Sequence, residues 1–166
     1  EVTLDMAASM EKIVRRSFPK AQLVTDRFHV QKLVYDAVQE MRIAHRWDAI
    51  EQENKEMELS RECKKTFIPH KLENGDTEKQ LLARSRYLLF KGEDKWTVSQ
   101  AHRADILFQR YPDLEKAYKL SRSLARIYQT SKLKGVAFTK LAHWYNEVEE
   151  AGFKSFNTVS RTIQNH

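Results

Sequence analysis

The chain has 166 residues, of which 41% are hydrophobic, and a formal net charge of +6 at pH 7. No apolar run approaches the roughly 20 residues of a membrane span, and the single cysteine, Cys63, excludes an internal disulfide. We therefore expect a protein of a reducing cytoplasm, with one domain or a helical domain joined to part of a second. Few glycines and prolines, with abundant Leu, Ala, Lys, Glu and Arg, favour helices over strands.

The first 26 residues predict a small βαβ unit. Residues 2–4 form a short apolar run that ends at Asp5, and residues 6–18 place apolar side chains at helical spacing. A second β-rich run, residues 21–25, ends at Asp26. Two short strands joined by one helix predict a parallel, right-handed unit. Because two such strands bury too little to stand as a sheet, either further strands are missing or the pair borrows an edge from another molecule, which favours a piece of a larger enzyme.

Two interpretations of Asp5 and Asp26 remain open on the residues alone. Each aspartate precedes a predicted helix, and aspartate is a preferred N-cap residue. Open α/β sheets also bind ligands at the carboxyl ends of their strands, where both aspartates are expected to lie. As a pair at one edge, they are therefore also candidates to hold a metal ion.

The remainder of the chain predicts helices, so the expected fold class is mainly α with a small βαβ element. A long helix begins at Arg27 and continues through the polar arm EQENKEMELSRE. Further helices are predicted at 78–90, 97–111, 113–129, 136–151 and 153–166, with Asp76 or Thr77 capping the first and Asn157 capping the last. A loop is predicted at 66–77, and a basic turn at Lys132, Lys134 and Gly135.

Positive charge is concentrated in the second part of the chain. Residues 1–60 carry a net charge of −2 and residues 61–166 a net charge of +8. Between positions 116 and 146 there are seven basic residues and no acidic one: Lys116, Lys119, Arg122, Arg126, Lys132, Lys134 and Lys140. Such a region attracts a phosphate backbone, although a solvated helix face can be basic without binding nucleic acid.

The segment TLDMAASMEKIVRRSFPKAQLVTDRFHVQKLV resembles the middle of a bacterial insertion-sequence transposase of the ISL-three type. The resemblance continues in WTVSQAHR, YPDLEKAYKL and AHWYNEVEEAGFKSF. In that group the second catalytic aspartate ends a strand. One helix and one strand later come an acidic residue or cysteine, two spacers and a histidine. Asp5 matches the aspartate, and the run from Asp26 to His29 matches the later signature.

The resemblance implies a DDE transposase that cleaves DNA and transfers the strand with Mg²⁺ as its cofactor. It implies a partial ribonuclease-H-like core over residues 1–46 and an all-helical insertion domain over residues 47–166. Asp5 would be a catalytic residue and a Mg²⁺ ligand, with Asp26 and His29 as supporting residues. The expected partner is DNA at the transposon ends, a homodimer is compatible with the family, and the location is the bacterial cytoplasm.

The resemblance also places the first acid before residue 1 and the third beyond His166, so we expect this chain alone to be inactive. Glu147, Glu149 and Glu150 are the alternative source of the third acid, although charged outer helix faces are common. The alternative function is a non-catalytic helical module that binds DNA or a partner helix through the basic 116–140 face.

Overall fold

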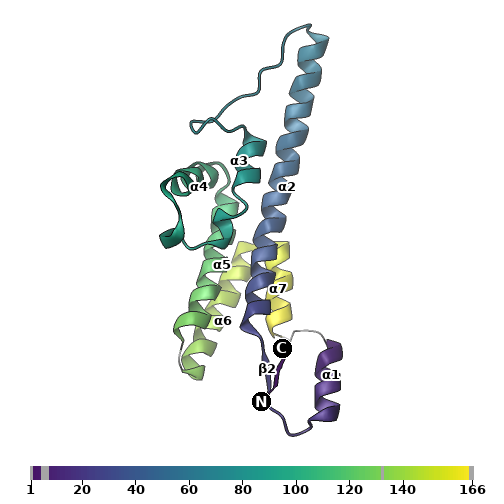
Figure 1. The fold of residues 1–166 in the computed structure, drawn as a ribbon, viewed down its shortest axis with the longest axis vertical. Helices are drawn as coiled ribbons and strands as arrows, with labels where there is room; N and C mark the ends of the chain where they lie inside the picture. The colour runs from purple at the N-terminus through teal and green to yellow at the C-terminus, as the bar shows by residue number, and fades with distance from the viewer. Residues whose placement is uncertain (1, 5–7, 132, 165–166) are drawn as a thin grey trace. The chain divides into compact units, whose positions relative to one another are not determined.

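The computed structural model describes residues 2–4, 8–131 and 133–164 (Figure 1). The elements, in chain order, are β1 (Val2–Leu4), α1 (Ala8–Ser17), β2 (Leu23–Thr25), α2 (Arg27–Glu62), α3 (Glu78–Arg84), the 3₁₀ turns η1 (Leu88–Phe90) and η2 (Glu93–Lys95), α4 (Val98–Arg110), α5 (Pro112–Thr130), α6 (Lys134–Ala151) and α7 (Lys154–Gln164). The predicted class, mainly helical with one small parallel strand pair, is confirmed.

The chain divides into two compact units. The first unit combines residues 1–37 with residues 120–166, and the second comprises residues 38–119. The predicted boundary between residues 46 and 47, which separates a catalytic core from a helical insertion, stays a prediction.

Strands β1 and β2 of the first unit pair in parallel, with α1 as the connection between them. Val2 lies opposite Leu23, and Leu4 opposite Thr25. Strand β2 begins at Leu23 rather than at the predicted residue 21. The reason is that the amide of Ala21 donates to the carbonyl of Phe18 at 2.9 Å, so the turn that follows α1 occupies these positions.

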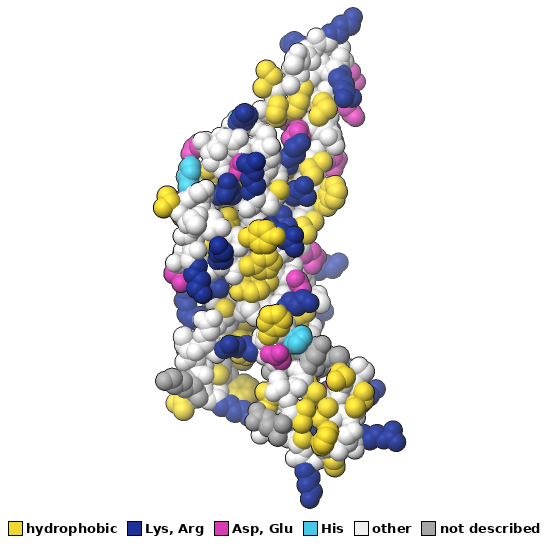
Figure 2. Space-filling view, in the orientation of Figure 1, with side chains coloured by type: hydrophobic (Ala, Val, Ile, Leu, Met, Phe, Trp, Pro, Cys, Tyr) yellow, Lys and Arg dark blue, Asp and Glu magenta, His cyan; other side chains and the backbone are white. Residues whose placement is uncertain are grey.

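The apolar face of α1 lies largely on the surface. Val14 is 7% exposed, whereas Met10, Ile13 and Phe18 are 45%, 56% and 60% exposed. Figure 2 shows hydrophobic side chains gathered over this helix. Met6, which the sequence predicts on the same face, lies outside the described residues. Two strands of three residues offer too little surface to cover such a face.

The core of the first unit is built on Trp144 of α6. Its side chain is 1% exposed, and its indole Nε1 donates to the carbonyl of Leu120 at 2.9 Å, which ties α6 to α5. The apolar side chains buried with it are contributed by α2, α5, α6 and α7: Val30, Val34, Ala37, Leu124, Ala125, Ile127, Val148, Phe156 and Val159. Full burial of one large side chain of this kind contributes about 1.5–3 kcal/mol.

Two corrections concern the ends of α6 and α7. Lys134 and Gly135 belong to the first turn of α6 rather than to a basic turn, because the amide of Ala137 already donates to the carbonyl of Leu133 at 3.0 Å. Asn157 lies inside α7 and does not cap it, since its amide donates to the carbonyl of Phe153 at 2.9 Å.

The second unit contains an ion-pair cluster around the buried side chain of Asp76. This side chain is 1% exposed, pairs with Arg84 and lies 3.2 Å from the Nε atom of Arg103. Its Oδ2 atom also accepts a hydrogen bond from Asn74 at 3.0 Å. Asp76 is therefore not the residue that starts α3. Thr77 takes that place, and its amide donates to the Gln80 side chain at 3.0 Å.

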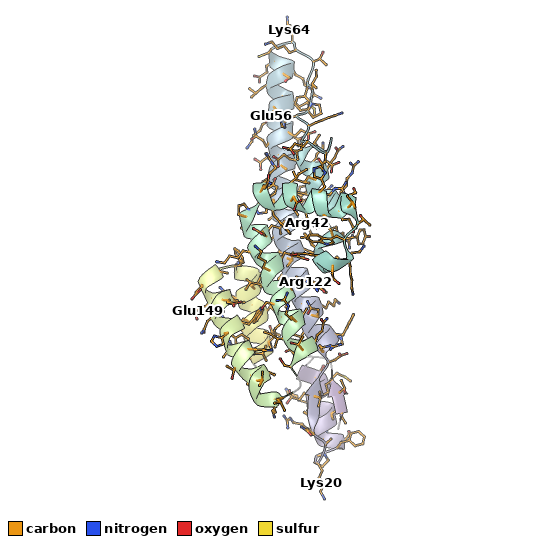
Figure 3. The ribbon with its side chains drawn as sticks, turned by 90° about the vertical axis from the view of Figure 1, so that its left-hand side faces the viewer. Lys20, Arg42, Glu56, Lys64, Arg122 and Glu149 are labelled. Carbon is orange, nitrogen blue, oxygen red and sulfur yellow. The ribbon has the colours of Figure 1, made fainter. Side chains whose placement is uncertain are left out.

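A single helix over 78–90 is wrong, because α3 ends at Arg84 and a 3₁₀ turn follows. Leu88 and Leu89 are adjacent in η1, and their side chains are only 1% and 0% exposed, so the 3₁₀ turn buries both. The carbonyl of Leu88 accepts from Trp96 Nε1 at 2.8 Å and from the Lys91 amide at 3.1 Å, contacts that a continuing α-helix does not make. Arg42 of α2, labelled in Figure 3, donates to the Leu82 carbonyl at 2.9 Å and fixes α3 against α2.

Replacement of Asp76 by Asn removes the charge on which Arg84 and Arg103 converge. We expect the free energy of unfolding of D76N to fall by about 2 kcal/mol, because the buried carboxylate loses its charge-assisted hydrogen bonds to Arg84 and Arg103, whose side chains are 56% and 20% exposed. Urea unfolding measures this change. D94N, at an exposed position of η2, is the matched control and should change the stability by less than about 0.5 kcal/mol. Equal stabilities of D76N and D94N would contradict the assigned role.

Candidate catalytic edge and nucleic-acid interface

Asp26 ends β2 and starts α2. Its amide donates to the carbonyl of Leu4 at 2.9 Å, which continues the strand ladder by one bond. Its Oδ1 atom accepts a hydrogen bond from the amide of Phe28 at 2.9 Å. A side chain that accepts from the second residue of the following helix is an N-cap, so the capping interpretation of Asp26 describes this geometry.

His29 lies one helical turn further, beside the same carboxylate. Its Nδ1 atom is 3.4 Å from Asp26 Oδ2, and the two side chains are 35% and 41% exposed. The imidazole ring packs edge-on against Phe28, with the ring centroids 5.8 Å apart. The structure therefore brings the two predicted supporting residues together at the carboxyl end of β2, where both remain accessible to solvent.

A hollow of about 250 Å³ adjoins this junction. Asp26, Arg27 and Phe28 line one side of it, and Tyr128 and Gln129 of α5 line another. Burial raises the pKa of the Tyr128 phenol. The phenol therefore stays protonated at neutral pH and can donate a hydrogen bond there.

Asp5 follows Leu4 in the chain and lies outside the described residues. The paired register ends with Leu4 opposite Thr25, and the next residue of each strand in the sequence is an aspartate. Within residues 2–4, 8–131 and 133–164, no three His, Cys, Asp or Glu side chains come together in a group that could hold a metal ion. Mg²⁺ requires several oxygen ligands, so Asp26 with His29 does not fit this ion without further acids.

The alternative acids of α6 do not form a group with this edge in the part of the chain that the structure describes. Glu147, Glu149 and Glu150 are exposed, and Glu149 projects outward from the helix (Figure 3). A role for any of them as the third acid stays a prediction.

Four of the predicted DNA-binding residues belong to the first unit. Arg122 and Arg126 lie on α5, and Lys134 and Lys140 lie on α6. Arg122, labelled in Figure 3, is half-buried, and the other three are exposed. The ammonium of Lys134 lies 5.6 Å from the centroid of the Phe138 ring. Lys132 lies outside the described residues.

The other two predicted DNA-binding residues, Lys116 and Lys119, belong to the second unit and are exposed on α5. Lys119 is paired with Glu115, 2.5 Å away and one helical turn earlier. The pair is solvent-exposed and adds little stability, but it partly neutralises the lysine.

A cavity of about 240 Å³ lies between α5 and α6 of the first unit. Arg126 and Lys140, both predicted to bind DNA, line it together with His143 and Glu147. His143 is not among the residues that the sequence pattern singles out. The signal that could have found it is its position three residues after Lys140, which places both on one side of α6.

The second unit has a cavity of different character. Its volume is about 430 Å³, and Asp48, Glu53, Glu56 and Glu78 are among its lining residues. Glu78 accepts a hydrogen bond from the Tyr111 hydroxyl. Glu78 pairs with Arg110, which also lines the cavity, and Glu53 pairs with Lys79, so two of the four carboxylates are neutralised. Asp48 and Glu56 still disfavour a phosphate group, so the cations of the first unit are the better candidates for contact with nucleic acid.

Comparison with known proteins identifies the family. The transposase family DDE_Tnp_ISL3 matches residues 1–166, so the chain belongs to the ISL3-type transposases, and the resemblance seen in the sequence is confirmed. The transposase for insertion sequence element IS1001 of Bordetella parapertussis is 25% identical to it over 168 residues, which are 99% of this chain and 35% of that protein. The chain thus spans about a third of the length of this relative. No solved structure matches significantly.

No helix within the described residues is long and apolar enough to cross a membrane.

The cap at Asp26 can be tested apart from any catalytic role. D26A removes the acceptor of the Phe28 amide, and we expect the free energy of unfolding to fall by about 1 kcal/mol. D26S keeps a capping oxygen and should stay close to the unsubstituted chain in the same urea titration. An equal loss in both variants would show that the carboxylate stabilises the fold in some way other than capping.

Proposed function

We propose that the chain is part of a transposase that cleaves DNA at the ends of an insertion sequence and joins the cut strand to a target. The observation that carries this proposal is the family match over residues 1–166. In this proposal the β1–α1–β2 unit is an edge of a ribonuclease-H-like catalytic core, and the helices from residue 47 onward form an insertion domain.

Two structural features support the core assignment. The parallel pairing of β1 and β2 brings the carboxyl ends of both strands to one edge, which is where open α/β sheets bind ligands. The exposed apolar face of α1 is the kind of patch that marks a contact surface. A larger sheet in the longer protein would supply that contact, since the IS1001 relative is nearly three times as long as the matched region.

The residues at this edge take separate roles in the proposal. Asp5 is a catalytic carboxylate and a ligand of Mg²⁺, in a set completed by acids elsewhere in the longer protein. Bound Mg²⁺ would activate the attacking oxygen and stabilise the leaving oxygen. Asp26 and His29 are positioning residues: Asp26 holds the start of α2, and His29 packs beside it.

The basic residues supply the contact with DNA. Arg122, Arg126, Lys134 and Lys140 would bind the phosphate backbone through the first unit, with Lys116, Lys119 and Lys132 adding positive charge along the chain. Phosphate contacts position a protein on DNA without reading its sequence. The bound DNA is a transposon end, and two copies of the protein can then hold two ends.

The catalytic role predicts that substitution of Asp5 abolishes DNA cleavage. In the longer protein, D5N should abolish strand cleavage of a labelled transposon end while DNA binding stays unchanged. D36N, at an exposed position of α2, is the control and should cleave normally. This chain alone should cut nothing. Full cleavage by D5N would favour the alternative, a non-catalytic helical module that binds DNA or a partner.

The DNA-binding role predicts that particular basic side chains determine how strongly the DNA affinity depends on salt. The affinity of this chain for a DNA duplex should fall as salt rises, and the double variant R122A/K134A should lower the slope of log affinity against log salt by about 2. R61A/K64A, at the far end of the α2 arm, removes the same charge and should leave the slope unchanged. Equal slopes for the two double variants would contradict the assigned surface, and no binding at moderate salt would indicate a plain structural domain.

A further inference from the structure

The cavity between α5 and α6 combines groups that suit a single small anion. Arg126 from α5 and Lys140 from α6 line it from two separate helices. His143 and the hydroxyl-bearing residues Ser123 and Thr130 complete the polar lining, and Ile127 and Trp144 are its apolar residues. Ile127 and Trp144 are 7% and 1% exposed, so the floor of the cavity belongs to the packed core.

Glu147 lines the cavity together with the two cations, and among the described residues no ion pair joins it to either of them. Elsewhere, Arg15, Lys55 and Lys119 each pair with a glutamate one turn earlier. One turn before and after Arg126, the chain has Arg122 and Thr130. One turn before and after Lys140, it has Val136 and Trp144. Within residues 2–4, 8–131 and 133–164, neither Arg126 nor Lys140 enters an ion pair. Two like charges that line one cavity repel each other, and an anion between them relieves that repulsion.

The walls of the cavity are fixed by hydrogen bonds that do not use its cations. The Trp144 indole donates to the Leu120 carbonyl at 2.9 Å and holds α6 against α5. The hydroxyl of Thr130 donates to the carbonyl of Arg126 at 2.9 Å within α5. A cavity that already exists without its ligand costs less ordering when the ligand binds.

We propose that this cavity is the seat of one DNA backbone phosphate, held by Arg126, Lys140 and His143. The inference deepens the proposed function and rests on it. The volume of about 240 Å³ corresponds to about eight water molecules, which leaves room for a phosphate group and part of its sugar. Guanidinium and ammonium groups donate only, which matches phosphate oxygens that only accept.

Glu147 and His143 adjust the affinity of the seat. The Glu147 carboxylate lines the same cavity and repels the phosphate. The imidazole of His143 can donate a ring N–H to a phosphate oxygen. The other ionisable groups that line the cavity with His143 are Arg126 from α5 and Lys140 and Glu147 from α6.

The first experiment measures binding of the full chain to a fluorescent DNA duplex by anisotropy. K140A and R126A should each weaken binding about tenfold and lower the salt slope by about 1. K154A and R161A remove the same charge from exposed positions of α7 that do not line the cavity, and should have much smaller effects. Circular dichroism melting shows that each variant is folded.

Removal of the negative charge of Glu147 should raise the DNA affinity, the opposite of the effect of removing a cation. E147Q should tighten binding several-fold, whereas E150Q, with the same charge change on the same helix outside the cavity, should have a much smaller effect. H143A removes a ring N–H donor from the cavity and should weaken binding several-fold, whereas H102A, at an exposed position of α4, should have a much smaller effect. If a cavity variant and its matched control change the DNA affinity equally, the proposed phosphate seat is wrong.

The outcomes also separate the seat from the proposed function. If the unsubstituted chain binds DNA and the matched pairs behave alike, the phosphate seat is wrong and DNA binding by this protein stands. If the unsubstituted chain does not bind DNA even at low salt, both the DNA-binding role of this chain and the seat are wrong.

Discussion

The parallel pairing of two three-residue strands is the constraint on which the proposed catalytic edge depends. Parallel strands need a crossover, which α1 supplies, and the crossover brings the carboxyl ends of both strands to the same edge. Asp26 ends one of these strands, and its two carboxylate oxygens serve different neighbours, the amide of Phe28 and the ring of His29. An antiparallel pair would place the two carboxyl ends at opposite edges and remove the basis for the proposed catalytic edge.

A second, independent constraint is the contact between α5 and α6. The buried indole of Trp144 cannot leave its N–H unpaired without cost, and it bonds to the carbonyl of Leu120. This contact holds Arg126 and Lys140, which are 14 positions apart in the chain, around one cavity. The core of the first unit therefore organises the same surface that is proposed to bind DNA.

Much of the fold was predictable because it depends on local signals. Pro112, Gly152 and the aspartates at the strand ends mark element boundaries, and Gly152 adopts a positive φ of 70° at the end of α6. What local signals could not predict is burial. Asp76 precedes a helix as a cap would, but it is buried between Arg84 and Arg103, and only the three-dimensional packing brings Arg103 to it. His143 and Arg126 line one cavity from two different helices, and this grouping likewise depends on three-dimensional packing.

The most direct test of the account is a crystal structure of the longer transposase bound to a transposon end and Mg²⁺. The account predicts a metal ion at the carboxyl ends of β1 and β2 with Asp5 among its ligands, and a DNA phosphate between Arg126 and Lys140. A metal ion bound elsewhere, without Asp5, would contradict it.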